Sequence, residues 1–388
     1  MGSFEGVLLA ALVIASTVVL AAPLLSSGLV YAALTQHAPI YIDGNAGFTS
    51  ANGVVSGLGT KNDPYIIENW EISAENSIGI FVTNTTARFI IRNCYVHDGK
   101  SNYKDGIFFY NVINGKIENN IVENTSLGIL LDNADNNLIS NDLFENNGTG
   151  ILLSHSNNNL VENNIASGNS HGFVLEGSNN LISNNIARAN SIGVTFLGSN
   201  NFILNNIIEN NEGYGIELTG GSNNNFSNNI VRNNHNDGIF LHHSENNIVS
   251  NNIFENNSYY GIELDHYAST RGNQIYHNNF INNGNQAYDS GSNYWDNGYP
   301  SGGNYWSDYT GLDTDGDGIG DTQYVISGDN NQDRYPLMKP FGEAQPAPFG
   351  ERNWSLIAGI VGVIAIIGVG LAIYLRVVKD DGRAGAGG

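Results

Sequence analysis

The sequence is poor in residues that bind soft metals, cross-link chains or attract polyanions. Its 388 residues include one cysteine, Cys94, and two methionines, Met1 and Met338. One cysteine excludes an intramolecular disulfide and a thiolate metal cluster, and the scarcity of soft sulfur ligands argues against tight capture of Cu(I). Lysine and arginine number 15 against 37 acidic residues, for a formal net charge of −22. Nucleic acid is not expected as a partner, because a phosphate backbone must be met by clustered basic side chains.

A short repeat fills the middle of the chain. The dipeptide Gly-Ile, or a close variant, returns at intervals of 21 to 27 residues. A fixed period this short is typical of a solenoid, and no repeat has an apolar pattern long enough for a helix. We therefore expect an all-β solenoid in which each coil contains three short strands. The repeat glycines are Gly79, Gly106, Gly128, Gly150, Gly172, Gly193, Gly215, Gly238 and Gly261.

Three columns of apolar residues appear when the repeats are stacked. Residues one and three positions after each glycine, such as Ile129 and Leu131, are expected to point into the coil. Recurrent Asn pairs such as Asn163-Asn164 are interpreted as turn ladders, because Asn tolerates left-handed backbone and stacked amides can bond from coil to coil. The third column, directly after each Asn pair, is also expected to face inward: Ile121, Leu143, Ile165, Ile186, Ile207, Ile230, Ile253 and Phe280.

Both ends of the chain carry membrane signals. Residues 1–33 contain an apolar stretch and are expected to be a signal peptide or an N-terminal anchor. Residues 355–375 are expected to form a transmembrane helix, because the stretch from Leu356 to Leu375 has no charge. Basic residues in 376–388 predict a cytoplasmic tail. The repeats are therefore expected outside the cell, on a single-pass anchor in the cell membrane.

The remaining boundaries follow from composition. They are 34–76 for an N-terminal cap and first strands, 77–286 for repeats of about 22 residues, 287–340 for an aromatic cap with an Asp-rich loop, and 341–354 for a Pro-rich linker. The aromatic residues after the repeats are expected to close the core, with stacking on sugar rings as the alternative. Candidate glycosylation sites are Asn84, Asn124, Asn147, Asn225 and Asn256.

Several segments outside the repeat carry a family resemblance. They are residues 40–45 (Ile-Tyr-Ile-Asp-Gly-Asn), 57–72, 303–309 and Tyr335–Met338. With the coils, they resemble NosD-type right-handed parallel β-helix proteins over residues 38–340. The resemblance implies that fold, with capped ends, in a surface or periplasmic setting and within a wider group of carbohydrate-binding and sugar-hydrolase domains. It also implies copper as a cofactor and an ABC transporter as a partner.

An acidic loop is the sharpest local motif. Asp313, Asp315, Asp317 and Asp321 hold its first, third, fifth and ninth positions, with a glycine at the sixth. This pattern is similar to the first part of an EF-hand calcium loop, in which alternate residues deliver oxygen ligands. The twelfth position is Tyr324, where an EF-hand has Glu, so further oxygens must come from elsewhere. We expect structural calcium, and the alternative is a solvated acidic turn.

A second constellation lies outside the core in the last coils. Positions two, four and five after the repeat glycines hold Glu217, then Phe240, His242 and His243, then Glu263, Asp265 and His266. Adjacent coils are ~4.8 Å apart, so His242 is expected beside Asp265. The same spacing places His243 beside His266.

This outer face has a catalytic and a metal-binding interpretation, besides simple solvated stacking. Candidate catalytic residues are Glu217, Glu263 and Asp265, because a polysaccharide lyase or glycoside hydrolase uses acids for proton transfer. Candidate metal ligands are His242, His243 and His266. A lyase or hydrolase would also need Arg or Lys nearby, and the pattern does not place Arg232 or Arg271 on the face.

We therefore expect a non-catalytic, membrane-anchored binding or adhesion protein that recognises glycans and is stabilised by calcium. The alternatives are a NosD-like copper-binding protein and a polysaccharide lyase or hydrolase.

Overall fold

The computed structural model describes residues 34–265 and 270–342, and the fold below belongs to the compact unit that ends at Phe341. The chain winds through about ten turns of a right-handed parallel β-solenoid, which confirms the predicted fold. No helix within the described residues is long and apolar enough to cross a membrane. The predictions for residues 1–33, 355–375 and 376–388, and for most of the 341–354 linker, lie outside the described residues.

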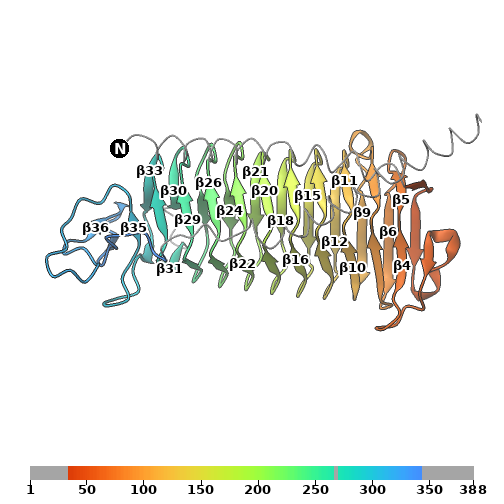
Figure 1. Cartoon of the computed structure of the whole chain (residues 1–388), viewed down its shortest axis with the longest axis horizontal. Coiled ribbons are helices and arrows are strands. Elements are labelled where there is room, and N and C mark those ends of the chain that lie inside the picture. Colours follow the sequence, from red (N-terminus) through yellow and green to blue (C-terminus); the bar gives the residue numbers. More distant parts are fainter. Residues whose placement is uncertain (1–33, 266–269, 343–388) are drawn as a thin grey trace, which may run out of the picture. The chain divides into compact units, whose positions relative to one another are not determined.

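Three parallel sheets line the solenoid, and successive turns add one strand to each (Figure 1). Sheet A consists of β1 (Thr35–Gln36), β5 (Trp70–Ser73), β8 (Tyr95–His97), β11 (Ile121–Glu123), β14 (Leu143–Glu145), β17 (Ile165–Ser167), β20 (Ile186–Arg188), β23 (Ile207–Glu209), β26 (Ile230–Arg232), β29 (Ile253–Glu255), β32 (Asn279–Ile281) and β35 (Tyr305–Trp306). Sheet B consists of β2 (Ile40–Asp43), β6 (Ile80–Thr85), β9 (Ile107–Val112), β12 (Leu127–Asp132), β15 (Thr149–Ser154), β18 (His171–Leu175), β21 (Ile192–Phe196), β24 (Ile216–Thr219), β27 (Ile239–His242), β30 (Tyr260–Leu264), β33 (Asn285–Asp289) and β37 (Ser327–Gly328).

Sheet C completes each turn and includes one antiparallel strand at its start. It consists of β3 (Val54–Ser56), β4 (Tyr65–Glu68), β7 (Phe89–Arg92), β10 (Gly115–Glu118), β13 (Leu138–Ser140), β16 (Leu160–Glu162), β19 (Leu181–Ser183), β22 (Phe202–Leu204), β25 (Asn225–Ser227), β28 (Ile248–Ser250), β31 (Arg271–Tyr276) and β34 (Ser292–Tyr294). Strand β3 pairs antiparallel with β4. The remaining elements are the antiparallel pair β36 (Tyr324–Val325) and β38 (Gln332–Asp333), and the 3-10 helices η2 (Asn45–Gly47), η3 (Ser50–Asn52) and η4 (Lys100–Asn102).

The two apolar columns after the repeat glycines form the sheet B wall of the core, as predicted. Ile129 pairs in register with Ile151, and Leu131 with Leu153, and all four side chains are buried. Alternation along each strand sends the intervening residue outward. Like residues therefore stack on like residues along the inside of the solenoid.

The predicted third column is wrong by one residue. In β17, Ala166 is fully buried whereas Ile165, directly after the Asn pair, is partly exposed. The second Asn of each pair already points inward at the corner, so strand alternation turns the next residue outward. The inward column of sheet A is instead Val122, Phe144, Ala166, Ala187, Ile208, Val231, Phe254 and Phe280. Of the predicted set only Phe280 belongs to it.

The Asn pairs form the expected turn ladder. Asn163 has a φ of 58°, the left-handed conformation that Asn tolerates. Asn164 is fully buried, and its Nδ2 donates to the Ile139 carbonyl and to Oδ1 of Asn185, both at 3.1 Å. Each buried amide is thus hydrogen-bonded to the backbone of the preceding turn and to the amide of the next turn, which offsets the cost of burying it.

Two further amide ladders, not predicted from the sequence, occupy the other corners. One runs through Asn137, Asn159, Asn180, Asn201, Asn224, Asn247, Asn273 and Asn293, and the other through Asn147, Asn169, Asn190, Asn211, Asn234, Asn257 and Asn283. In each ladder the backbone N–H of an Asn donates to the side-chain oxygen of the Asn one turn later, so the last Asn of each ladder needs another acceptor. Asp333 is the acceptor for the ladder that contains Asn164, Asp289 for the ladder that ends at Asn293, and Gln286 for the ladder that ends at Asn283.

The repeat glycine is required where sheet A and sheet B approach each other. A Cβ atom on Gly150 would lie 2.5 Å from the Gly172 carbonyl oxygen of the next turn and 3.2 Å from the Cβ of Ala166. Because the backbone of the next turn cannot move without breaking its ladder, no larger residue fits. This close approach explains why the glycine recurs in nine successive turns, from Gly79 to Gly261.

Aromatic rings close the C-terminal end of the core. Trp306 stacks between Phe280 at 4.4 Å and Tyr324 at 4.2 Å, and its Nε1 donates to Asp333 at 2.9 Å. Trp295 is likewise buried. These two tryptophans therefore cover the last rung of the core instead of presenting an exposed sugar platform.

Candidate functional site

The outer face of sheet B changes character along the solenoid. In the early turns it is apolar, and the rings of Phe81 and Phe108 stack there at 4.8 Å. From β24 to β33 it carries acids and aromatic rings, contributed by the residues directly before and two after each repeat glycine, with Gln286 at the glycine position in the β33 turn. We define the acid–aromatic face as Tyr214, Glu217, Asp237, Phe240, Tyr260, Glu263 and Tyr288.

Aromatic residues on this face meet diagonally across neighbouring turns. Tyr214 stacks on Phe240 with ring centroids 5.1 Å apart and an interplanar angle of 12°. Two turns further on, Tyr260 meets Tyr288 at 5.6 Å and 48°. All four rings are partly exposed. Their faces and edges therefore offer an apolar surface to a ligand, while the tyrosine hydroxyls offer hydrogen bonds.

A carboxyl pair lies between the two aromatic pairs. Asp237 is 1% exposed, accepts the backbone N–H of Tyr260 at 2.8 Å and is hydrogen-bonded to the carboxyl group of Glu263. Burial raises the pKa of Asp237 to about 7, the backbone hydrogen bond opposes that rise, and the charge of Glu263 adds to it. The neutral form of Asp237 is therefore favoured beside Glu263, because two adjacent carboxylates repel each other.

The tyrosines beside the carboxyl pair stay neutral. Burial raises the pKa of Tyr214, and the charges of Asp237, Glu263 and Glu217 raise it further. Burial likewise raises the pKa of Tyr260, helped by Glu263 and Asp237. Both hydroxyls thus remain hydrogen-bond donors at neutral pH.

The predicted contact between His242 and Asp265 is present. The Nδ1 atom of His242 contacts Oδ2 of Asp265, and Asp265 also accepts a 2.8 Å hydrogen bond from Thr270. Asp265 is 5% exposed, so it lies deeper than the solvated position expected for it. His243 follows in the left-handed conformation, its ring centroid 4.2 Å from that of His242. His266 lies outside the described residues.

The three candidate catalytic acids have different neighbours. Glu263 pairs with Asp237, Asp265 pairs with His242, and Glu217 is separated from Glu263 by the turn that carries Phe240. The two arginines considered from the sequence lie outside sheet B. Arg232, in sheet A, pairs with Glu209, and Arg271, in sheet C, pairs with Glu245.

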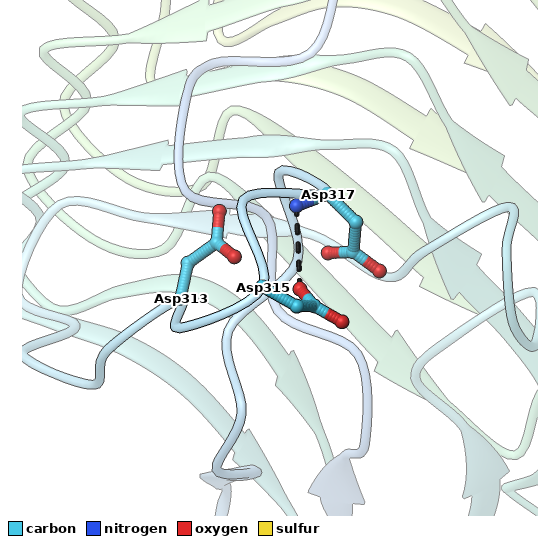
Figure 2. Close-up of side chains that lie close together, drawn as sticks. All are labelled: Asp313, Asp315 and Asp317. Carbon is cyan, nitrogen blue, oxygen red and sulfur yellow. Dashed lines mark hydrogen bonds between the residues drawn. The ribbon is translucent and has the colours of Figure 1, made fainter.

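The acidic loop brings three of its four predicted ligands together (Figure 2). Ligand oxygens of Asp313, Asp315 and Asp317 all lie within 4.8 Å of one another. Asp313 also accepts backbone N–H groups from Gly316 at 2.7 Å and Gly318 at 3.0 Å, which shapes the turn.

Asp321 takes a different part in the acidic loop. Its carboxylate accepts two hydrogen bonds from Thr314, from the backbone N–H at 3.0 Å and from the hydroxyl at 2.8 Å. It therefore ties the start of the loop to its end instead of joining the three clustered aspartates.

The candidate glycosylation sites differ in exposure. Asn124 and Asn256 are exposed between strands, Asn84 is exposed within β6, and Asn225 is partly exposed in β25. Asn147 is fully buried, and its Nδ2 donates to the Val122 carbonyl at 3.0 Å. A glycan on Asn147 would have to break the ladder, so this sequon has no accessible amide in the folded chain.

Sequence reasoning missed Tyr214, Asp237 and Tyr260. All three directly precede a repeat glycine, a position that was not assigned to any face. The signal was available, because this column alternates between aromatic and acidic residues in the last coils. What could not be seen was that side chains one turn apart meet diagonally, since that depends on the lean of each side chain along its strand.

Known proteins resemble this chain in sequence and in fold. The family model described as periplasmic copper-binding protein (NosD) matches residues 92–196 and 167–311, which together span more than half of the chain. No curated protein sequence matches it.

Solved structures share the solenoid at low sequence identity. The A-module of the Azotobacter vinelandii mannuronan C-5 epimerase AlgE4 is 16% identical, with a TM-score of 0.44 over 72% of this chain and 87% of that chain. The A-module of AlgE6 from the same organism is 17% identical, with a TM-score of 0.47 over 59% and 79%. A double mutant of the periplasmic alginate epimerase AlgG is 16% identical, with a TM-score of 0.43 over 59% and 78%. At this level the likeness concerns the fold alone.

Proposed function

The chain belongs to the NosD family of periplasmic copper-binding proteins, and from that premise we propose that it is a cell-surface β-helix that binds polysaccharide along the acid–aromatic face. In this proposal the repeats face the cell exterior on a C-terminal single-pass anchor at residues 355–375, as expected from the sequence.

The proposal rests on two pairs of aromatic rings with a pair of carboxyl groups between them, all on one rigid face. Tyr214 and Phe240 form one aromatic pair, Tyr260 and Tyr288 another, and the hydrogen-bonded carboxyls lie between them. Sugars present apolar ring faces and a rim of hydroxyls, so they bind aromatic platforms with nearby hydrogen-bonding groups. Because the strands are locked by three amide ladders, little conformational entropy is lost on binding.

Binding of the purified full chain to immobilised polysaccharides tests this proposal. The double variant Tyr214→Ala/Phe240→Ala removes one aromatic pair, and we expect affinity to fall at least tenfold. Phe202→Ala is the matched control, because Phe202 is a 48% exposed ring on the outer face of sheet C. Equal losses in both variants would place the binding surface elsewhere.

Calcium at the acidic loop is a further part of the proposal. Asp313, Asp315 and Asp317 supply hard oxygen donors on one short arc, as calcium prefers. The loop follows the aromatic cap in sequence. The proposed ion would therefore stabilise the C-terminal end of the solenoid and not contact the ligand.

Copper binding is the second candidate function, and the donor set fits only one oxidation state. Imidazoles suit Cu(II), and a carboxylate that contacts Nδ1 of a histidine orients the ring as in many metal sites. His242 and Asp265 have this relationship. The soft ligands preferred by Cu(I) are scarce among the described residues, which include only Cys94 and Met338 as sulfur donors. Cys94 is fully buried, and burial raises its pKa to about 12.

Calorimetry with Cu(II) and Zn(II) tests this second candidate. Neutral imidazoles bind metals, so affinity should fall as pH drops through ~6.5. The triple variant His242→Ala/His243→Ala/His266→Ala should abolish the heat of binding. Metal binding that is unchanged in the triple variant would rule out this site.

A further inference from the structure

His97 has one ring nitrogen that is buried without a hydrogen-bond partner. This atom is Nε2, and it finds no partner among the described residues, while the whole side chain is 16% exposed. The other ring nitrogen, Nδ1, lies 2.7 Å from Oδ2 of Asp98. Buried polar atoms in native folds are almost always paired, so an unpaired one needs a physical explanation such as a bound ion.

Glu71 places a carboxylate oxygen opposite this nitrogen. Oε1 of Glu71 lies 3.6 Å from Nε2 of His97, which is too long for a hydrogen bond. Because the Asp98 carboxylate can only accept, Nδ1 carries the ring proton, and Nε2 of the neutral ring is left with a lone pair. Nε2 and Oε1 therefore face each other as two acceptors. A positive charge between them, either a second proton or a metal ion, removes this opposition.

We propose that His97 and Glu71 bind a borderline divalent metal ion of the zinc class through Nε2 and Oε1. Zinc bonds to nitrogen and oxygen measure roughly 2.0–2.2 Å, so an ion bonded to both atoms across 3.6 Å makes an angle of roughly 110–120°, near the tetrahedral value. Water or the second Glu71 oxygen would complete the coordination. The Asp98 carboxylate on the other ring nitrogen fixes the tautomer and the orientation of the imidazole, as in many metal sites.

Two neighbouring strands hold these donors in place. Glu71 lies in β5 and is in register with Tyr95 of β8, two residues before His97. Ile72 and Val96 are buried, so strand alternation sends Glu71 and His97 to the outer face of sheet A. The Tyr95 ring stacks on the imidazole with centroids 4.4 Å apart and an interplanar angle of 21°. An ion at this position would join two successive turns of the solenoid.

The residues of the site depart from the repeat. The Glu71 position holds Leu or Ile in the later turns of sheet A: Leu143, Ile165, Ile186, Ile207, Ile230 and Ile253. Asp98 has a φ of 69°, and the equivalent left-handed corner holds Asn in most later turns, as at Asn124 and Asn210. Asn would serve this backbone equally well. Packing and backbone geometry alone therefore do not account for the two acids beside His97.

Titration calorimetry of the full chain with Zn(II) tests the proposal. The titrated chain carries His242→Ala/His243→Ala/His266→Ala, so the candidate copper site does not contribute, and excess calcium competes for the acidic loop. We expect a single saturable zinc site whose affinity falls as pH drops, because protons compete for the imidazole. Zinc should also raise the Tm, since it binds the folded form alone.

Two variants and a control assign the binding to this site. His97→Ala should remove it. Glu71→Gln keeps the side-chain volume, so the fold should persist, and zinc affinity should fall at least about tenfold, the loss typical even of residues that only support a metal ligand. His155→Ala is the matched control and should bind zinc unchanged, because Nδ1 of His155 lies 3.8 Å from Asp132 but its side chain is 76% exposed.

Three results would overturn this assignment. They are zinc binding that persists in His97→Ala, an equal loss in His155→Ala, and a chain with His97 and Glu71 intact that takes up no zinc. The last result would mean that a proton alone lies between the two side chains. The proposed polysaccharide function does not depend on this site and is tested separately.

Discussion

Asp142 accepts two hydrogen bonds from Asn120, from the backbone N–H at 2.7 Å and from Nδ2 at 2.9 Å. Asp142 is thus a carboxyl group in a column that is otherwise made of amides. The Oδ2 atom of Asp142 is buried and has no hydrogen-bond partner among the described residues. In Asn164, one turn later, the equivalent side-chain atom is Nδ2, which donates a hydrogen bond. Burial raises the pKa of Asp142 to about 8, against the hydrogen bonds from Asn120 that lower it. A protonated carboxyl is therefore the form that fits the ladder.

The substitution Asp142→Asn should remove a pH dependence of stability. Because the folded-state pKa lies above the unfolded value, the folded chain holds a proton that the unfolded chain releases. The stabilisation is complete below about pH 4 and is lost as pH rises toward 8, by up to about 1.4 kcal/mol per pH unit. Urea unfolding of parent and variant at pH 5 and pH 8 measures this difference.

The reverse substitution one rung later is the control. Asn164→Asp places a second carboxyl in the same ladder and should steepen the loss of stability with pH. A parent chain and Asp142→Asn variant with the same pH profile would mean that Asp142 is ionised in the folded state.

The inward columns of sheet B should not tolerate charge. Leu175 is 1% exposed and packs in the core, whereas Glu176, the next residue, is exposed and accepts a 2.7 Å hydrogen bond from Ser154. Leu175→Asp buries an unpaired carboxylate and should lower the free energy of unfolding by several kcal/mol. Glu176→Lys should change it by less than about 1 kcal/mol. Thermal unfolding followed by circular dichroism compares the two.

The two members of an Asn pair should respond differently to substitution. Asn163 is needed for its left-handed backbone, so Asn163→Gly should be tolerated while Asn163→Val should cost roughly 1–2 kcal/mol. Asn164→Ala leaves the Ile139 carbonyl and the Asp142 N–H without partners, at a cost of about 2–4 kcal/mol. Denaturant unfolding of the three variants measures both effects, and an equal response at the two positions would contradict the ladder.

The limits of the sequence-based predictions have a physical basis. The solenoid and two core columns were predictable, because Ile129 and Leu131 stand at a constant distance from a recurrent glycine. The third column, directly after each Asn pair, was misplaced by one residue. Two identical residues such as Asn163 and Asn164 do not reveal that one side chain faces solvent and the other faces the core. The contact of His242 with Asp265 follows from register alone, whereas the pairing of carboxyls across the diagonal requires side-chain directions.

Calcium should stabilise the chain through the acidic loop. Without a cation the clustered carboxylates of Asp313, Asp315 and Asp317 repel one another. A ligand that binds only the folded form adds about 2.7 kcal/mol at a concentration one hundred times its Kd. Calcium should therefore raise the Tm of the full chain and slow proteolysis of the loop, and magnesium should do less because it demands tighter octahedral geometry.

The double variant Asp315→Asn/Asp317→Asn assigns this calcium effect to the loop. It removes two charges while keeping side-chain volume, so it should abolish the rise in Tm and leave polysaccharide binding at the acid–aromatic face unchanged. Asp98→Asn, an exposed acid far from the loop in sequence, should keep the full response to calcium. A rise in Tm that persists in the double variant would move the calcium site to the carboxylates of sheet B. Loss of polysaccharide binding in the same variant would instead mean that the loop takes part in recognising the ligand.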